Sequence, residues 1–439
     1  MTYPTNILQQ VQTYQPSSLA LLQNICVFIE IANKKFQNFQ NMTANLGSTV
    51  NFDLPYRFVS SEGLVANLGG ITQRLQPLTV DQANNVSYAV SDPQRIFNYS
   101  QQDYMANIGN DAIAEEGANI ERNLALNCES AVPVNNIVNG NIVPTGALHT
   151  ESGPFRFYGD GVTAINSYQQ LDQMIENFLD FGAVKQGIRV VLPNVIFPAI
   201  IGNGLTQFAL DRNNQIANSW DVGSFGNPPV KYYKSNLLPI HVSGTLGQAA
   251  TTLTVVSTND PTGAAITQIT CSGAGTDANA VKSGDLGAFK DGVTNQPDMR
   301  YLTFVGHSPS SQQVQFRATA SAASSGGNVT FNIYPALCSQ NGNPNQNLNN
   351  AIAAGMQIKF LPSHRCGIVI GGNGYFLGMP RMPEQTPFPS SNKMDETSGA
   401  NLLMYYGSIF GQAQQGIVNC AVWGSTMVPE YCMRVIVPL

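Results

Sequence analysis

The chain is short of charge. Only 11% of its 439 residues are Asp, Glu, Lys or Arg, and lysine is absent between Phe36 and Val184. Globular proteins usually carry about 25% charged residues, and a monomer relies on them to stay dispersed. The shortage therefore favours a surface that is covered by other copies of the chain. The net charge of −6 gives no overall attraction to nucleic acid or to an anionic membrane.

The patterns of catalytic and metal sites are also missing. The sequence has no H-E-x-x-H, no G-x-S-x-G and no Walker lysine beside the glycines of residues 371–374. Asp285 and Asp291 lie around a glycine-rich turn, which favours a structural role. The four histidines are isolated from one another: His149, His241, His307 and His364. We therefore expect no catalytic residue, no metal and no cofactor.

Cysteine usage and the hydrophobic runs indicate the cellular compartment of the protein. The seven cysteines form no C-x-x-C pair, so we expect them to be reduced and buried in a cytoplasmic protein. The first residues include no basic segment, and the apolar run 19–32 is interrupted by Gln23, Asn24 and Glu30. We expect neither a signal peptide nor a membrane span.

One long amphipathic stretch, residues 100–131, predicts a single helix. Ser100 and Asp103 form an S-x-x-D start signal, and no proline follows until Pro133. Its apolar residues keep helical spacing: Met105, Ile108, Ala112, Ile113, Ile120, Leu124 and Cys128. The other face carries six acidic residues against Arg122 alone: Asp103, Asp111, Glu115, Glu116, Glu121 and Glu129. Two interpretations stay open, a face exposed to water or a face that meets basic groups of another subunit.

Strand patterns flank this helix. Val50, Phe52 and Leu54 alternate with polar residues, and residues 86–90 alternate again as the predicted return strand. About 25 residues separate them, and an isolated hairpin is marginal in water, so this loop needs a partner. Residues 167–181 predict a second amphipathic helix that ends at Gly182, and residues 188–192 predict a buried strand.

From residue 242 to residue 335 the chain changes to short alternating strands between turns. This pattern predicts an all-β barrel or sandwich inserted in another domain. Its expected inward-facing residues are Leu253, Val255, Leu302, Phe304, Val314, Phe316, Phe331 and Ile333. Further strands are expected near residues 356–361, 402–406, 418–423 and 433–437.

The order of these features resembles one family. The segments that carry the resemblance are Gly47-Ser-Thr-Val-Asn-Phe, Pro55-Tyr-Arg57, Gln76-Pro-Leu-Thr-Val-Asp-Gln82, Ser235-Asn-Leu-Leu-Pro239, His364-Arg365 and the ending Val422-Trp-Gly, Val428-Pro-Glu and Arg434-Val. Together they resemble the major capsid proteins of tailed bacteriophages, with the α+β Hong-Kong-97-type fold. The likeness is greatest to coat proteins of short-tailed phages with an inserted β-barrel domain.

The resemblance implies a division of the chain. Residues 1–46 would be an N-terminal arm, 47–92 an extension loop and 93–159 a peripheral domain with the spine helix at 100–131. Residues 160–241 would begin the axial domain, 242–335 would be the inserted barrel, and 336–439 would return to the axial and peripheral domains. The implied function is self-assembly into pentamers and hexamers of an icosahedral shell around double-stranded DNA. A separate scaffolding protein and a portal protein are the implied partners, with assembly in the host cytoplasm.

A subunit interface follows from this scheme, in which the loop of one copy lies over the acidic helix of the next. Its predicted residues are Arg57, Leu64, Val65, Leu68, Ile71, Arg74, Arg95, Asp111, Glu115, Glu116 and Glu121. An encapsulin-type nanocompartment would share the fold but hold a protein cargo. A β-rich adhesin or spike is the alternative from another class, and an enzyme would need a site that the sequence does not show.

Overall fold

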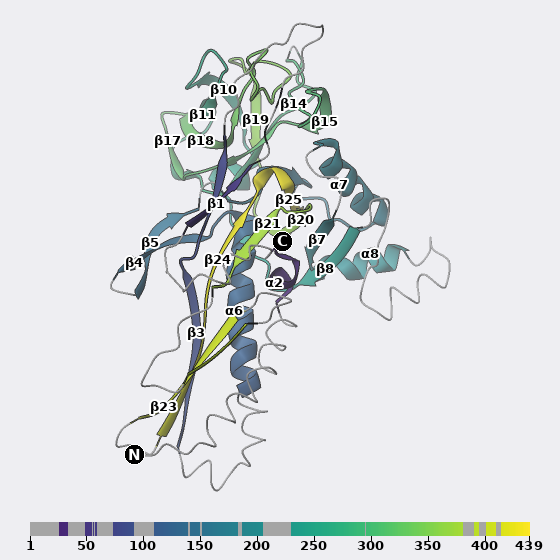
Figure 1. The fold of residues 1–439 in the computed structure, drawn as a ribbon. Coiled ribbons are helices and arrows are strands. Elements are labelled where there is room, and N and C mark those ends of the chain that lie inside the picture. The colour runs from purple at the N-terminus through teal and green to yellow at the C-terminus, as the bar shows by residue number, and fades with distance from the viewer. Residues whose placement is uncertain are drawn as a thin grey trace, which may run out of the picture.

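The computed structural model describes residues 26–33, 49–54, 56, 58, 73–91, 109–138, 141–149, 152–182, 187–204, 230–294, 296–380, 390–394, 401–409 and 414–439. These residues form an α+β molecule with three parts along one long axis (Figure 1). A β-barrel lies at one end, a mixed sheet with two helices lies in the middle, and a long sheet with one long helix extends to the other end.

The middle part is built on the sheet β6-β25-β20-β7-β8, with β9 beside β20. Its strands are β6 (Phe157–Tyr158), β7 (Ile188–Pro193), β8 (Val230–Ser235), β9 (Ile240–His241), β20 (His364–Ile370) and β25 (Cys432–Val437). The central strands are buried along nearly their whole length, and α7 and α8 contribute to the same core. The predicted strands at 188–192 and 433–437 are therefore confirmed.

Helix α7 (Tyr168–Asp180) confirms the second predicted helix. Ser167 caps it, because its Oγ accepts a hydrogen bond from the backbone nitrogen of Gln170 (3.3 Å). Gly182 follows with φ of +76°, a backbone conformation that glycine adopts without strain. Pro193 is followed by the 3-10 turn η2 (Asn194–Ile196) and by α8 (Phe197–Gly204).

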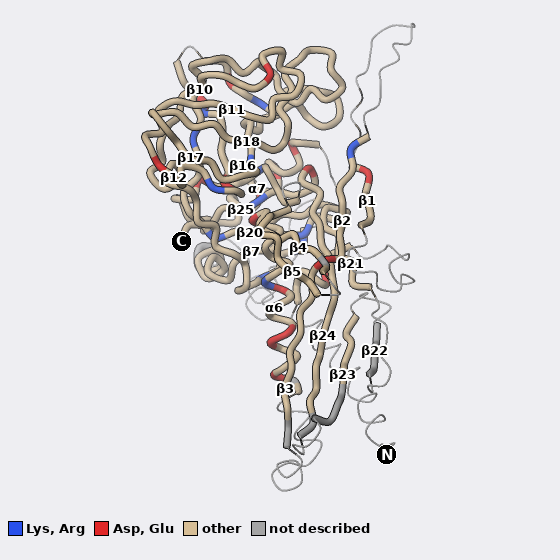
Figure 2. Tube along the Cα trace, turned by 90° about the vertical axis from the view of Figure 1, so that its left-hand side faces the viewer, with Lys and Arg blue, Asp and Glu red and all other residues tan. Residues whose placement is uncertain are grey.

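The long end of the molecule is a helix packed on a sheet. Its strands are β3 (Gln82–Ser91), β21 (Tyr375–Gly378), β22 (Ser390–Met394), β23 (Asn401–Ile409) and β24 (Gln414–Met427). Strand β24 pairs with β3 on one side over ten residues without a bulge, and with β23 on the other. Helix α6 (Asn110–Glu129) packs against β3 and β24. Strands β3, β23 and β24 contain no charged residue, as the tan tubes show in Figure 2.

Helix α6 confirms the later part of the predicted long helix. Five residues expected on its apolar face are buried: Ala112, Ile113, Ile120, Leu124 and Cys128. The helix ends at Glu129 rather than at residue 131, because Ser130 adopts a left-handed conformation (φ 60°). The start signal at Ser100 and Asp103 lies outside the described residues.

The predicted all-β unit is a closed barrel of six antiparallel strands. The ring runs β11-β10-β19-β13-β16-β18 and closes from β18 back to β11. Its strands are β10 (Thr252–Thr258), β11 (Ile266–Ser272), β13 (Leu286–Phe289), β16 (Gln315–Ala318), β18 (Asn328–Leu337) and β19 (Gln357–Phe360). Strands β12 (Asp277–Val281) and β17 (Ala322–Ser325) extend from β18 as a flap, while β14 (Arg300–Leu302) and β15 (Pro309–Gln313) form a separate pair. The short helix α10 (Thr245–Gln248) precedes the first barrel strand.

All eight residues predicted to face inward here are buried. Phe316, Phe331 and Phe360 form the centre of the core, with the rings of Phe331 and Phe360 5.1 Å apart. The predicted boundary at residue 335 is wrong for the barrel, because β19 lies beyond it and fills the place between β10 and β13. The strand expected near 356–361 therefore belongs to the barrel.

Two ribbons leave the body. Strand β1 (Thr49–Asp53) pairs with β2 (Leu75–Thr79), and β4 (Pro133–Val138) pairs with β5 (Asn141–Leu148). The predicted strand at 86–90 is confirmed as part of β3, but its expected pairing with the strand at 50–54 is wrong, because β3 pairs with β24 and β1 pairs with β2. Strand β2 contains Pro77, which is tolerated because β2 is an edge strand.

The first described element is the short helix α2 (Val27–Ile31), which lies within the apolar run 19–32. It is held against α6, where Glu121 Oε2 accepts a hydrogen bond from the backbone nitrogen of Phe28 (3.0 Å). All seven cysteines are free thiols, six of them buried. Among the helices of the described ranges, none is long and apolar enough to cross a membrane.

Candidate assembly surfaces and the barrel joint

The β1–β2 ribbon has a firm root. The ring of Phe52 stacks on Phe376 of β21, with centroids 4.3 Å apart and planes 11° from parallel. Gln76 Nε2 donates to Thr426 Oγ1 of β24 (2.8 Å). Phe58, which follows β1, is 64% exposed. The ribbon is therefore anchored to its own body at the root, with an exposed aromatic side chain near its end.

Arg74 fixes the same root to the rest of the chain. Its Nη2 lies 2.6 Å from Oε1 of Glu430, a residue of the 3-10 turn η3 (Pro429–Tyr431) that is almost fully buried. Burial lowers the pKa of Arg74, but Glu430 and Tyr334 of the barrel outweigh it and raise the pKa overall. Arg74 therefore faces both the C-terminal segment and the barrel.

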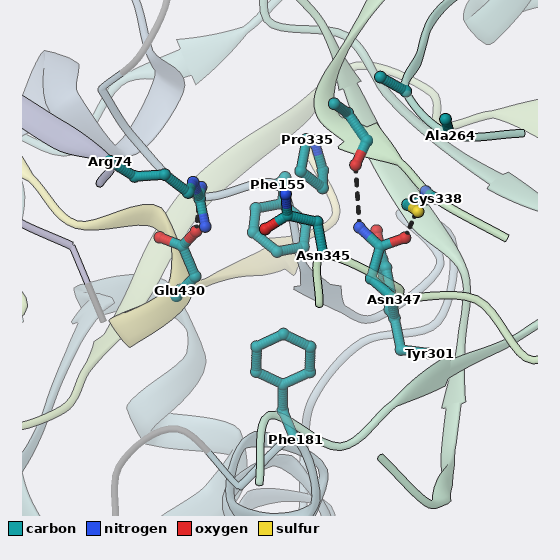
Figure 3. A pocket seen from close by; sticks show the side chains of 12 residues that line it. Arg74, Phe155, Phe181, Ala264, Tyr301, Pro335, Cys338, Asn345, Asn347 and Glu430 are labelled. Atoms are coloured by element: carbon teal, nitrogen blue, oxygen red, sulfur yellow. Dashed lines mark hydrogen bonds and ion pairs between the residues drawn. The ribbon is translucent and has the colours of Figure 1, made fainter. Parts of the chain in front are cut away.

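A cavity of about 170 Å³ lies beside this ion pair (Figure 3). The rings of Phe155 and Phe181 line it, and Asn347 bridges its barrel side by donating to Ala336 O (2.9 Å) and accepting from Cys338 N (2.7 Å). The side-chain amide of Asn347 is thus hydrogen-bonded to the barrel backbone. The cavity lies where the β1–β2 ribbon, the barrel and the body meet.

The β4–β5 hairpin is the second projecting ribbon. No residue from Val132 to Leu148 is charged, and Val138 and Val143 are 52% and 44% exposed. Its base is anchored, because Asp81 Oδ2 accepts from the backbone nitrogen of Asn135 (3.2 Å) and Gln82 Nε2 donates to Pro133 O (2.8 Å). The hairpin is therefore held out from the body with apolar side chains in water.

The predicted interface residues fall into three groups. Six lie outside the described side chains: Arg57, Leu64, Val65, Leu68, Ile71 and Arg95. Arg74 pairs with Glu430 of its own chain. On α6, Asp111 and Glu115 are exposed, whereas Glu116 and Glu121 are buried. The interpretation of the acidic residues as one exposed face is therefore wrong for Glu116 and Glu121.

Those two carboxyl groups are buried between α6 and its neighbours. Desolvation raises the pKa of Glu116 to about 8, and neither of its oxygens has a hydrogen-bond partner among the described residues. Desolvation also raises the pKa of Glu121, to about 7, although bonds from Phe28 N and Ser235 Oγ act against it. Glu116 therefore holds its proton at neutral pH, and Glu121 titrates in the neutral range.

The barrel is joined to the body through buried arginines that the sequence analysis missed. Arg156 donates to Glu430 O (3.0 Å) and reaches Gln312 Oε1 of β15 (3.4 Å). Arg317 of β16 donates to Ser152 O (2.6 Å), and Arg434 of β25 donates to Gly284 O (3.1 Å). The three side chains are at most 1% exposed. These bonds cross the joint in both directions and hold the barrel firmly.

Burial lowers the pKa of Arg156 to about 10 and of Arg317 to about 9, so both stay charged at neutral pH. Their sequence contexts share a signal, because each buried arginine stands between two apolar residues: Phe155-Arg-Phe157, Phe316-Arg-Ala318 and Met433-Arg-Val435. A buried arginine needs acceptors, and backbone carbonyls supply part of them here, while Nε of Arg156 and Nε and Nη2 of Arg434 have no partner among the described residues. Within the described ranges, no group of three or more His, Cys, Asp or Glu side chains is placed to hold a metal ion.

Comparison with known proteins leads to phage structures. No protein-family model matches the sequence, and no curated protein matches it. A chain of Mycobacterium phage Che8 is 9% identical, with a TM-score of 0.44, over 93% of this chain and 90% of that one. A chain of the cyanophage Pam1 capsid is 9% identical, with a TM-score of 0.40, over 92% and 87%. A chain of the Ralstonia phage GP4 capsid is 7% identical, with a TM-score of 0.38, over 93% and 88%.

Proposed function

We propose that this chain is the major capsid protein of a tailed bacteriophage and assembles into the icosahedral shell around its double-stranded DNA. The observation that carries the proposal is the pair of anchored ribbons, β1–β2 and β4–β5, which leave a body that is poor in charge. Two-stranded ribbons are marginal in water by themselves, so their exposed faces call for a neighbour. In a closed shell, each copy supplies that neighbour to the next.

The parts of the molecule then take the roles of a Hong-Kong-97-type subunit. The segment between β1 and β2 is the extension loop, and α6 is the spine helix of a peripheral domain whose sheet is β3-β24-β23-β22. The middle sheet with α7 and α8 is the axial domain, and the barrel is the insertion. Residues 1–46 act as the N-terminal arm. The role is structural and needs no catalytic residue, metal or cofactor.

The contact between copies places the extension loop of one over α6 of the next. Asp111 and Glu115 are the exposed acids of α6 that can meet Arg57 or Arg95 of a neighbour. Each exposed pair contributes only about 0–1 kcal/mol, so burial of apolar loop residues supplies most of the energy. These residues are Leu64, Val65, Leu68 and Ile71.

The shell consists of pentamers and hexamers located in the virion capsid. A separate scaffolding protein directs assembly in the host cytoplasm, and a portal protein replaces one pentamer. The net charge of −6 limits contact with the packaged DNA to weak, non-specific binding, and no membrane takes part.

Electron microscopy of particles purified from cells that produce the full chain together with its scaffolding protein tests the proposal. We expect closed shells from the natural sequence and failure of closure when residues 59–71 are deleted, which spares Arg74 and the ribbon root. The control is Val305→Ser, in the turn between β14 and β15, where the side chain is 77% exposed, and it should still close. Normal shells from the deletion variant would refute the loop contact. Shells that hold a protein cargo and no DNA would mean a nanocompartment instead.

A further inference from the structure

One histidine connects all three parts of the molecule. His241 of β9 is 2% exposed and pairs with His364 of β20 in the body sheet. Its Nδ1 lies 2.9 Å from Oε1 of Glu129, the last residue of α6. Its Nε2 lies 2.8 Å from Oδ1 of Asp285, in the turn before barrel strand β13. The imidazole ring thus bridges the long helix and the barrel.

The geometry defines the protonation state of this ring. An ionised carboxylate only accepts hydrogen bonds, and a neutral imidazole has a single N–H. Asp285 also accepts from the backbone nitrogens of Gly244 (3.1 Å) and Lys282 (2.7 Å) at its other oxygen, Oδ2. Both ring nitrogens of His241 lie within 3 Å of carboxyl oxygens, and a doubly protonated, positive ring donates to both of them.

The groups around the ring of His241 have opposite effects on its pKa. Burial lowers the pKa of His241 and so does Arg434, but the bonds to Asp285 and Glu129 outweigh them and the pKa is raised overall. The ring of His364 lies 5.3 Å away, and burial lowers the pKa of His364 to about 3, so it is neutral. Its Nδ1 donates to Pro362 O (2.8 Å). The Cys366 thiol, on β20 beside this site, is buried and its pKa is raised by burial.

We propose that the charged ring of His241 latches the barrel to the end of α6, and that loss of its proton at alkaline pH releases the helix end while the barrel turn stays in place. A neutral ring has one N–H, so one carboxylate then faces a lone pair at less than 3 Å. Asp285 keeps its backbone donors and is 1% exposed, whereas Glu129 is 17% exposed and can turn to water. Glu129 is therefore the partner that leaves.

The sign of the pH dependence follows from the raised pKa. The latch is complete below the ordinary histidine pKa of 6.5 and is lost as the pH rises through the higher value of the folded chain. The barrel and α6 are thus coupled firmly in neutral and acidic solution and less firmly in alkaline solution. Because the ring belongs to a single chain, this coupling operates in a free subunit as well as in a shell.

Hydrogen exchange of the full-length, unassembled chain tests the latch. Protection of the end of α6, corrected for the intrinsic pH dependence of exchange, should fall at least tenfold between pH 6.5 and pH 9.5. Protection of the turn at residues 282–286 should change less. In Glu129→Gln the amide can donate to a neutral ring, so the end of α6 should keep its protection across this range. The matched control His149→Gln removes a different histidine–carboxylate pair, 3.6 Å from Asp81, and should retain the pH response.

A second measurement keeps the proposal testable if the Glu129→Gln variant does not fold. Nitrogen chemical shifts of ¹⁵N-histidine in the natural chain, assigned with His241→Gln, should show two protonated ring nitrogens for His241 at pH 7 and a neutral ring for His364. A neutral His241 at pH 7, or protection at the end of α6 that does not depend on pH, would overturn the latch.

Discussion

Replacing Glu116 by glutamine should make the subunit more stable at neutral and alkaline pH. Glu116 is fully buried on α6, and its pKa of about 8 compares with an ordinary value of 4.5. Between these two values the native chain holds a proton that the unfolded chain has lost. Stability therefore falls as the pH rises from 4.5 to 8 and levels off above.

The size of the effect follows from the same two values. Their difference corresponds to about 4–5 kcal/mol over the whole range, at about 1.4 kcal/mol for each pKa unit. Glutamine has the same shape and no proton to lose, so it avoids this penalty. At pH 5 the buried amide and the buried acid both lack partners, and the two proteins should be nearly equal in stability. At pH 8 the variant should be more stable by about 3–5 kcal/mol.

Urea denaturation from pH 5 to pH 9 measures this difference. Trp423 is a suitable fluorescent probe, because it is buried in the core cluster that includes residues of α6. Glu116→Gln should still lose some stability as the pH rises through neutrality, because Glu121 has a pKa of about 7. This loss should be smaller than that of the natural chain. Glu115→Gln, at an exposed position of the same helix, should follow the natural chain. Parallel pH profiles for Glu116→Gln and the natural chain would refute the burial argument.

Three further outcomes are expected. Arg74→Gln should lower stability by about 1–3 kcal/mol, because it leaves the buried Glu430 without its cation, while Arg74→Lys should lose less in the same urea assay. A fragment of residues 243–361 should melt cooperatively, whereas 243–337 should not, because the shorter one lacks β19; a cooperative melt of both would show that β19 is dispensable. Particles boiled in reducing detergent should run as monomers, since no lysine occurs between Phe36 and Val184 to cross-link the loop, and a ladder of multimers would contradict this.

Local patterns predicted the elements better than their partners. Helix α7 was predicted from its apolar spacing and from Gly182 at its end, and α6 was predicted from its long apolar face. Both signals are short-range, so they survive without knowledge of the fold. The partner of β1 depends on which distant strand is free to pair, and an alternating pattern alone does not distinguish β2 from β3.

The buried charges were missed for a related reason. A glutamate on an amphipathic helix faces water by default, and only the sheet of β3 and β24 packed over α6 buries Glu116. Likewise, the barrel boundary at residue 335 was drawn where the alternating pattern faded, although a strand of four residues, β19, followed a stretch rich in amides. A short strand such as β19 is defined by the neighbouring strands it pairs with, and a local sequence pattern does not show these.

The position of β19 also orders events during synthesis. Five strands of the barrel ring leave the ribosome before residue 338, but the gap between β10 and β13 stays open until residues 357–360 follow. Until then two edges with unpaired backbone groups are exposed, and such edges invite pairing with another chain. Strand β20, which pairs with β7, β9 and β25, begins at His364, only four residues after β19 ends. When β19 pairs with β10 and β13, it therefore brings β20 close to the body sheet in which β20 pairs. The barrel ring and the body sheet are then completed in the same stage of folding.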